Sequence, residues 1–79
     1  MMPELFKILM TDTVDRNLVD LMMVDGLPKL FNDLPEATLF CEDLNRVARE
    51  ESATWRYEPS LFTAAEQTVL KASLMRDMF

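Results

Sequence analysis

The last stretch of the chain, residues 63–79, constrains the fold most, because it predicts a helix that no residue of the sequence ends. Thr63 and Glu66 have the T-x-x-E spacing of a capping box, in which each side chain accepts a hydrogen bond from the other residue's amide. No Gly or Pro follows, and Leu70, Leu74 and Met78 form an apolar stripe at helical spacing. A second apolar stripe lies beside it. A helix that is apolar over so much of its circumference is either central to a small core or shared with a partner.

The sequence predicts an all-α fold, a small helical bundle that forms a single domain over residues 1–79. The predicted main helices are 12–24, 36–51 and 63–79, with a short N-terminal helix at 3–10 and a connecting helical turn at 28–33. The chain contains one Gly, which argues against a strand-rich fold with many tight turns. The alternative for residues 3–10 is a strand, because a short apolar run such as FKILM fits both structures.

The first predicted main helix begins at an N-cap, Thr11 or Asp12, and ends at Asp25-Gly26, where glycine is free to adopt a left-handed conformation. Its buried stripe consists of four apolar residues at helical spacing, namely Val14, Leu18, Leu21 and Met22. The second, 36–51, has well-separated apolar and charged faces. Residues 52–60 predict a connector, in which the alternation of Ala53, Trp55 and Tyr57 permits a short extended segment. The predicted core is Phe6, Leu9, Val14, Leu18, Leu21, Met22, Leu30, Phe31, Phe40, Leu44, Val47, Trp55, Val69, Leu70 and Leu74.

The composition favours a protein of a reducing compartment, and we expect a cytoplasmic location. One Cys cannot form an intramolecular disulfide, and the N-terminus does not resemble a signal peptide. No apolar run approaches the roughly 20 residues of a membrane span, so no membrane association is expected. The formal net charge is −6, and all of it falls within residues 1–51, because residues 52–79 hold three basic and three acidic side chains. Direct binding to nucleic acid would need the opposite sign.

No residue pattern predicts catalysis, so the chain is expected not to be an enzyme and to hold no cofactor or metal. It contains no His, and its serines lack the context of a nucleophile. The acidic residues Asp12, Asp15 and Asp20 are too irregularly spaced for a calcium loop. Cys41 lies on the apolar face of its predicted helix, where burial keeps the thiol protonated.

The remaining prediction concerns surfaces. Several apolar side chains exceed what one small core can bury and predict a protein-binding patch: Val19, Met23, Leu39, Met75, Met78 and Phe79. An acidic surface is predicted on the helix 36–51: Glu36, Glu42, Asp43, Glu50 and Glu51.

The main hypothesis is a small non-enzymatic module that binds a larger protein partner and regulates or inhibits it. One alternative is a structural subunit of a homo- or hetero-oligomer. The other is an acidic mimic of nucleic acid that blocks a DNA- or RNA-binding protein, with Asp12, Asp15, Asp20 and Asp25 adding to its charge. Small size, acidity and a lack of catalytic residues are typical of compact regulatory proteins, including many encoded by bacteriophages.

Overall fold

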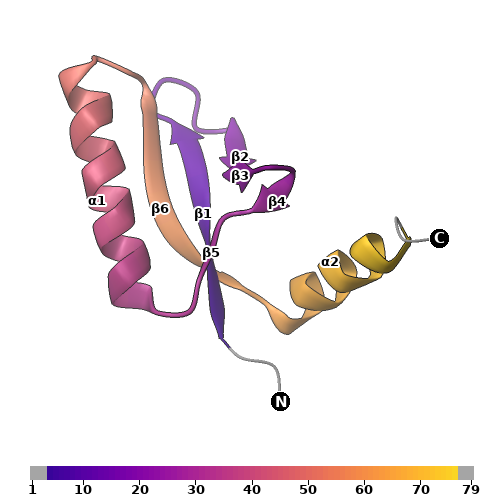
Figure 1. The fold of residues 1–79 in the computed structure, drawn as a ribbon. Coiled ribbons are helices and arrows are strands. Elements are labelled where there is room, and N and C mark those ends of the chain that lie inside the picture. The colour runs from indigo at the N-terminus through magenta and orange to yellow at the C-terminus, as the bar shows by residue number, and fades with distance from the viewer. Residues whose placement is uncertain (1–3, 77–79) are drawn as a thin grey trace.

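The structure is a computed structural model that describes residues 4–76, and it shows an α+β fold. A four-stranded antiparallel sheet packs against one helix, and a second helix extends from the end of the sheet (Figure 1). The predicted all-α helical bundle is therefore wrong.

The central strand of the sheet is β1 (Leu5–Asp12). Along one edge it pairs over its whole length with β6 (Trp55–Phe62), and along the other it pairs with two short strands, β2 (Val19–Leu21) and β5 (Leu30–Phe31). Because β5 and β6 are both antiparallel to β1, they are parallel to each other, and α1 (Leu34–Glu50) connects them. The centre of the fold is thus a βαβ unit with β1 inserted between its two strands.

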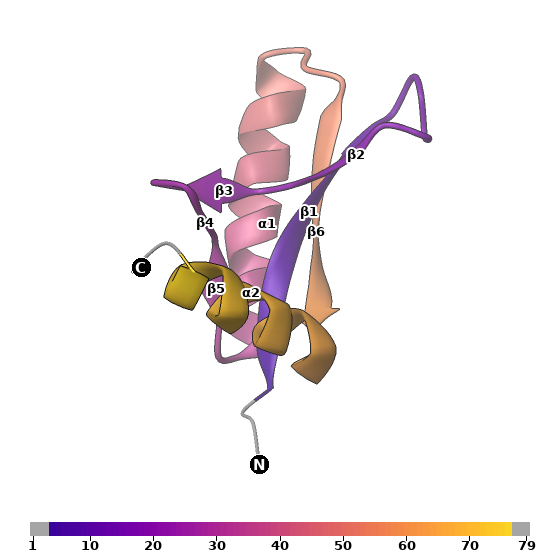
Figure 2. The ribbon, with the colours of Figure 1, turned by 90° about the vertical axis from the view of Figure 1, so that its right-hand side faces the viewer.

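Two elements extend from the sheet on the side away from α1 (Figures 1 and 2). One is the hairpin of β3 (Met23–Val24) and β4 (Leu27–Pro28), and the other is α2 (Ala64–Arg76). The chain is consequently elongated, with extents of 43 × 25 × 21 Å. Its radius of gyration is 14.1 Å, whereas a compact domain of this length has about 11.6 Å.

The hydrophobic core lies between α1 and the sheet, and it is small. Ile8 of β1 is fully buried against Ala37 and Cys41 of α1. The other buried apolar residues described are Ala48 and Phe62. None of the fifteen residues of the predicted core is among these five. Phe6, Met22, Phe31 and Phe40 from that prediction are half-buried and pack against the cluster, whereas others such as Val14, which is 80% exposed, face solvent.

The predicted helix 12–24 is a loop followed by strands, because its acidic side chains stabilise turns instead of a helix. The Asp12 carboxylate accepts a hydrogen bond from the amide of Val14 at 2.9 Å, and Asp15 accepts one from the amide of Asn17 at 3.1 Å. Both are bonds to a backbone group two residues on, which compete with helix formation. Past this loop the chain forms β2 and pairs with β1.

Three other segments predicted as helical or connecting contain strands. Residues 3–10 follow the strand alternative, since the described part from Leu5 onward is β1, and residues 28–33 contain β5 instead of a helical turn. Within the predicted connector, 52–60, the alternating residues from Trp55 onward begin β6. Long-range pairing of β1 with β5 and β6 decides these conformations, and periodicity within a short segment does not reveal it. The helices predicted at 36–51 and 63–79 are confirmed in position by α1 and, within the described residues, by α2.

Candidate protein-binding face

The register of the sheet assigns its side chains to two faces, since directly paired antiparallel residues point the same way. Ile8 pairs with Pro59 and faces α1, together with Phe6 and Tyr57. The alternate residues face the other side, which α1 does not cover. On that side lie four half-buried leucines from three strands, Leu5, Leu9, Leu21 and Leu30. We call this side of the sheet the open face.

At one end of the open face, α2 projects away from the sheet, and an apolar cleft lies where the two meet (Figure 1). The cleft has a volume of about 210 Å³ and is lined by Leu5, Leu30, Phe62, Gln67, Leu70, Lys71 and Leu74. Phe62 is buried at its base, while Leu74 on the rim is 44% exposed. No residue of α2 is buried, so within the described residues this helix covers only a part of the open face.

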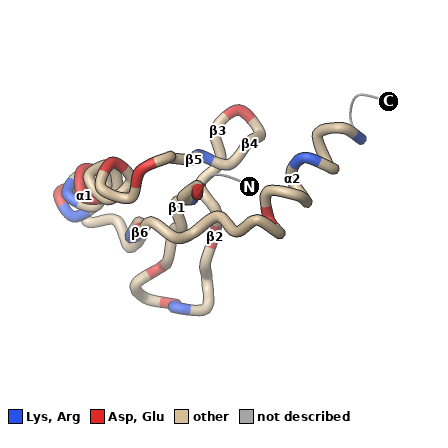
Figure 3. Tube along the Cα trace, turned by 90° about the horizontal axis from the view of Figure 1, so that it is seen from below, with Lys and Arg blue, Asp and Glu red and all other residues tan. Residues whose placement is uncertain are grey.

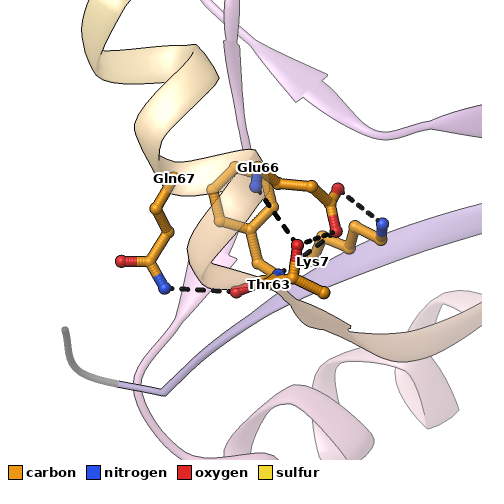
Figure 4. A network of polar contacts seen from close by, with 5 residues as sticks. Lys7, Thr63, Glu66 and Gln67 are labelled. Atoms are coloured by element: carbon orange, nitrogen blue, oxygen red, sulfur yellow. Dashed lines mark hydrogen bonds and ion pairs between the residues drawn. The ribbon is translucent and has the colours of Figure 1, made fainter.

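The start of α2 is fixed by the predicted capping box, which the structure confirms (Figure 4). The amide of Glu66 donates to the Thr63 hydroxyl at 3.1 Å, and the amide of Thr63 donates to the Glu66 carboxylate at 3.2 Å. The same carboxylate accepts from Lys7 Nζ of β1 at 2.7 Å, and the Gln67 side-chain amide donates to the Phe62 carbonyl at 3.2 Å. The hydrogen bond from Lys7, and then that from the Thr63 amide, lowers the pKa of Glu66. These bonds orient α2 relative to the sheet.

We expect Glu66→Gln to lower the free energy of unfolding by about 0.5–1 kcal/mol at pH 7, because glutamine keeps the capping box but loses the ion pair to Lys7. A carboxyl with a lowered pKa stabilises the fold above its ordinary value, about 4.3, and this contribution is lost as the pH falls through the lowered pKa. The penalty should therefore vanish in acid. Urea denaturation at several pH values measures it, with exposed Glu42→Gln as control. An equal penalty at pH 7 and below about pH 3 would contradict the ion pair.

The β3–β4 hairpin flanks the open face and exposes apolar side chains. Asp25 and Gly26 form its turn with φ values of 53° and 81°, the left-handed region that a two-residue hairpin loop requires. The sequence Asp-Gly between apolar residues is a strong hairpin signal, so its interpretation as a helix end was wrong. Val24 and Leu27 pair directly across the hairpin, and both are exposed.

Three features of the outer edge of β6 hinder the pairing of a further strand there. The first is Pro59, which pairs with Ile8 of β1. The Ile8 carbonyl accepts a hydrogen bond from the Met22 amide, on the side of β1 away from β6, so the backbone groups of Pro59 point to the outer edge of the sheet. Proline has no N–H to donate there. Two residues away, the Asn45 side chain of α1 accepts from the Tyr57 amide at 2.7 Å and donates to the Tyr57 carbonyl at 2.9 Å. Beyond it, Arg56 Nη1 donates to the Trp55 carbonyl at 2.7 Å. Partner binding by strand addition at β6 is thus disfavoured.

Two features of residues 4–76 concern metal binding and the reactivity of the cysteine. No group of three or more His, Cys, Asp or Glu side chains in this range could hold a metal ion. Cys41 is buried, as predicted, and burial followed by the nearby charge of Glu58 raises the pKa of its thiol. A thiol that is buried and protonated is a poor nucleophile. No helix among the described residues is long and apolar enough to span a membrane.

The predicted partner-binding residues do not form one patch. Val19 lies on β2, Met23 on β3, Met75 on α2 and Leu39 on α1, and all four are exposed. Leu39 is separate from the other three, because α1 lies on the opposite side of the sheet from the hairpin and α2 (Figure 1). Met78 and Phe79 fall outside the described residues. Val24, Leu27 and Leu74 are also exposed, although the prediction did not include them. It had assigned the first two to a helix end and a connector and the third to the core.

The predicted acidic residues are all exposed, and they lie on the other side of the molecule. Glu36, Glu42, Asp43 and Glu50 belong to α1, and Glu51 is its C-cap. Figure 3 shows that this helix carries basic as well as acidic residues. Asp43 lies 3.5 Å from Arg46, so part of the negative charge is neutralised locally. The open face is separate from this surface.

Comparison with protein families found no matching family, and comparisons with curated proteins and with solved structures found no match.

Proposed function

We propose that the chain is a non-enzymatic protein-binding module that regulates or inhibits its partner, and that it binds through the open face. The observation that supports this most is a sheet with one face packed on α1 and the other left uncovered, where half-buried leucines are bordered by exposed apolar side chains of the hairpin and α2. Apolar side chains gathered on one side of a small protein mark an interaction site. The proposed contact surface comprises Leu9 and Leu21 of the sheet, Val24 and Leu27 of the hairpin, and Leu70 and Leu74 of α2.

The shape of this surface favours a protein over a small ligand. Small-molecule sites are usually enclosed cavities of about 300–1,000 Å³, whereas the cleft beside α2 has about 210 Å³ and opens to solvent. Its neighbours, the hairpin and α2, both extend outward and would add contact area on either side of a docked partner (Figure 2). The buried free Cys41 is compatible with the cytoplasmic location that we propose.

Acidic mimicry of nucleic acid ranks below this proposal. A mimic needs carboxylates spaced like phosphates over one surface, but Arg46 and Arg49 interrupt the acidic residues of α1. The ion pair between Arg46 and Asp43 weakens that surface further.

Site-specific photo-cross-linking in cells of the source organism tests the proposal. A photoreactive phenylalanine analogue replaces Val24, Leu74 or Leu39, three exposed apolar residues of which only the first two border the open face. We expect covalent protein adducts from positions 24 and 74, and at least about tenfold fewer from the control position 39, because contact buries only the open face. An adduct with a second copy of the chain and an adduct with a different protein both support the proposal. Adducts from position 39 alone, or from none of the three, would contradict the proposal.

A further inference from the structure

The chain exposes more surface than a compact monomer of its mass. A protein of 9.2 kDa exposes about 4,900 Å² when it folds alone, whereas this chain exposes 5,950 Å². The excess, about 1,000 Å², is close to the roughly 800 Å² that each partner buries in a stable protein–protein interface. The surplus surface is therefore of the size that one interface covers.

The charges that flank the open face favour pairing with the open face of a second copy of the chain. On one side of the open face, the β3–β4 hairpin, residues 23–28, contains Asp25 but no Lys or Arg. Asp20 of β2 does not belong to this side, because it pairs with Met10 and so points toward α1. Residues 67–76 of α2 contain Lys71 and Arg76 but no carboxylate. An interface with two-fold symmetry places the same patch on both partners, so a patch with one acidic and one basic side can be complementary to itself.

The remaining acidity does not oppose such pairing at close range. The exposed carboxylates of α1 lie on the other side of the sheet, and their repulsion is screened over about 8 Å at physiological salt. The register also places Lys7, Arg56 and Glu58 on the open face, because Arg56 pairs with Thr11 and Glu58 pairs with Leu9. The charge of Lys7 is already paired with Glu66. Arg56 and Glu58 belong to the edge strand β6, and Lys71 lines the rim of the cleft, so apolar contact between two open faces leaves these three charges at its border.

We propose that the occupant of the open face is a second copy of this chain, in a two-fold dimer in which α2 of each copy lies against the β3–β4 hairpin of the other. This inference rests on the proposed function and names its partner. The dimer covers Leu74 and Val24 of both copies and leaves α1 exposed on its two outer sides.

Sedimentation velocity of the full chain from about 1 to 200 μM tests the dimer, because its upper end populates the dimer even at a micromolar dissociation constant, the weak end for interfaces of standard size. The expected mass at the upper end is twice the 9.2 kDa of one chain. Leu74→Asp should remain a monomer, with at least about a 30-fold weaker dimerisation constant, since a carboxylate would be buried in an apolar contact. Leu39→Asp on α1 is the matched control and should dimerise like the original chain.

Circular dichroism should show both variants folded, because Leu74 and Leu39 are exposed in the single chain. A monomer of the original chain at every concentration would overturn the dimer, and so would equal dissociation by Leu39→Asp and Leu74→Asp. Failure of the dimer and failure of the proposed function are distinguishable. If the chain is monomeric but still forms adducts with another protein from positions 24 and 74, the dimer is wrong and the binding face is kept.

Discussion

Replacing Ile8 by alanine is expected to lower the free energy of unfolding by about 2–5 kcal/mol. Ile8 is the one large side chain of the described residues that is fully buried, and it contacts the core cluster of Ala37 and Cys41. A domain of 79 residues has a total stability of only about 4–12 kcal/mol, so this single cavity can unfold much of the population. Urea denaturation followed by circular dichroism measures the loss.

Two further variants keep this prediction measurable if Ile8→Ala does not fold. Ile8→Val removes one methylene and should cost about 0.5–1.5 kcal/mol, which leaves a folded protein with a lower urea midpoint. Leu39→Ala truncates a side chain that is 63% exposed and should change the free energy by less than about 0.5 kcal/mol. An effect of Leu39→Ala equal to that of Ile8→Ala would place the core elsewhere.

Replacing Asn45 by alanine is expected to cost about 1–3 kcal/mol and to open the outer edge of β6. The variant loses both hydrogen bonds to the backbone of Tyr57, each worth about 1 kcal/mol, and leaves a half-buried amide and carbonyl without these partners. Urea denaturation measures the stability, and hydrogen exchange of the Tyr57 amide reports the bond itself. That amide should exchange faster in the variant relative to its neighbours.

Two matched variants separate the effect of the hydrogen bonds to Tyr57 from that of losing an amide side chain in general. Asn45→Asp keeps an acceptor for the Tyr57 amide, so this amide should stay protected from exchange, but its second oxygen faces the Tyr57 carbonyl, so the stability should still fall. Asn17→Ala, at an exposed loop position, should lie within about 0.5 kcal/mol of the original chain. Unchanged protection of the Tyr57 amide in Asn45→Ala would show that Asn45 does not close the edge.

The two helices were predictable because their signals are local. The capping box of Thr63 and Glu66 depends on residues three apart, and the apolar face of α1 repeats over seventeen residues. Such patterns do not need the rest of the fold. Burial of Cys41 followed from the same periodicity.

The sheet was missed because its evidence is not local. The spacing of Val14, Leu18, Leu21 and Met22 matches a helix, but this agreement is coincidental, since Val14 is in a loop and Leu21 is in a strand. The identity of β1 depends on pairing with β6, about fifty residues away in the sequence. Only Asp25-Gly26 was a short-range signal that could have corrected the error, because it predicts a hairpin as well as a helix end.

The candidate binding face was predictable only in part. An excess of apolar residues over what a small core can hold indicated an exposed surface, and Val19, Met23 and Met75 are exposed. Grouping such residues requires the strand order and the direction in which α2 leaves the sheet. The leucines of the open face come from three different strands, so no spacing in the sequence brings them together.

The most direct test of the binding face is an intermolecular NOE experiment on a mixture of methyl-labelled and unlabelled copies of the chain. The dimer through the open faces predicts NOEs between methyl groups of Leu70 or Leu74 in one copy and those of Val24 or Leu27 in the other, and none from Leu39. Intermolecular NOEs that involve Leu39 instead, or a complete absence of them at the highest concentration of the sedimentation series, would contradict it.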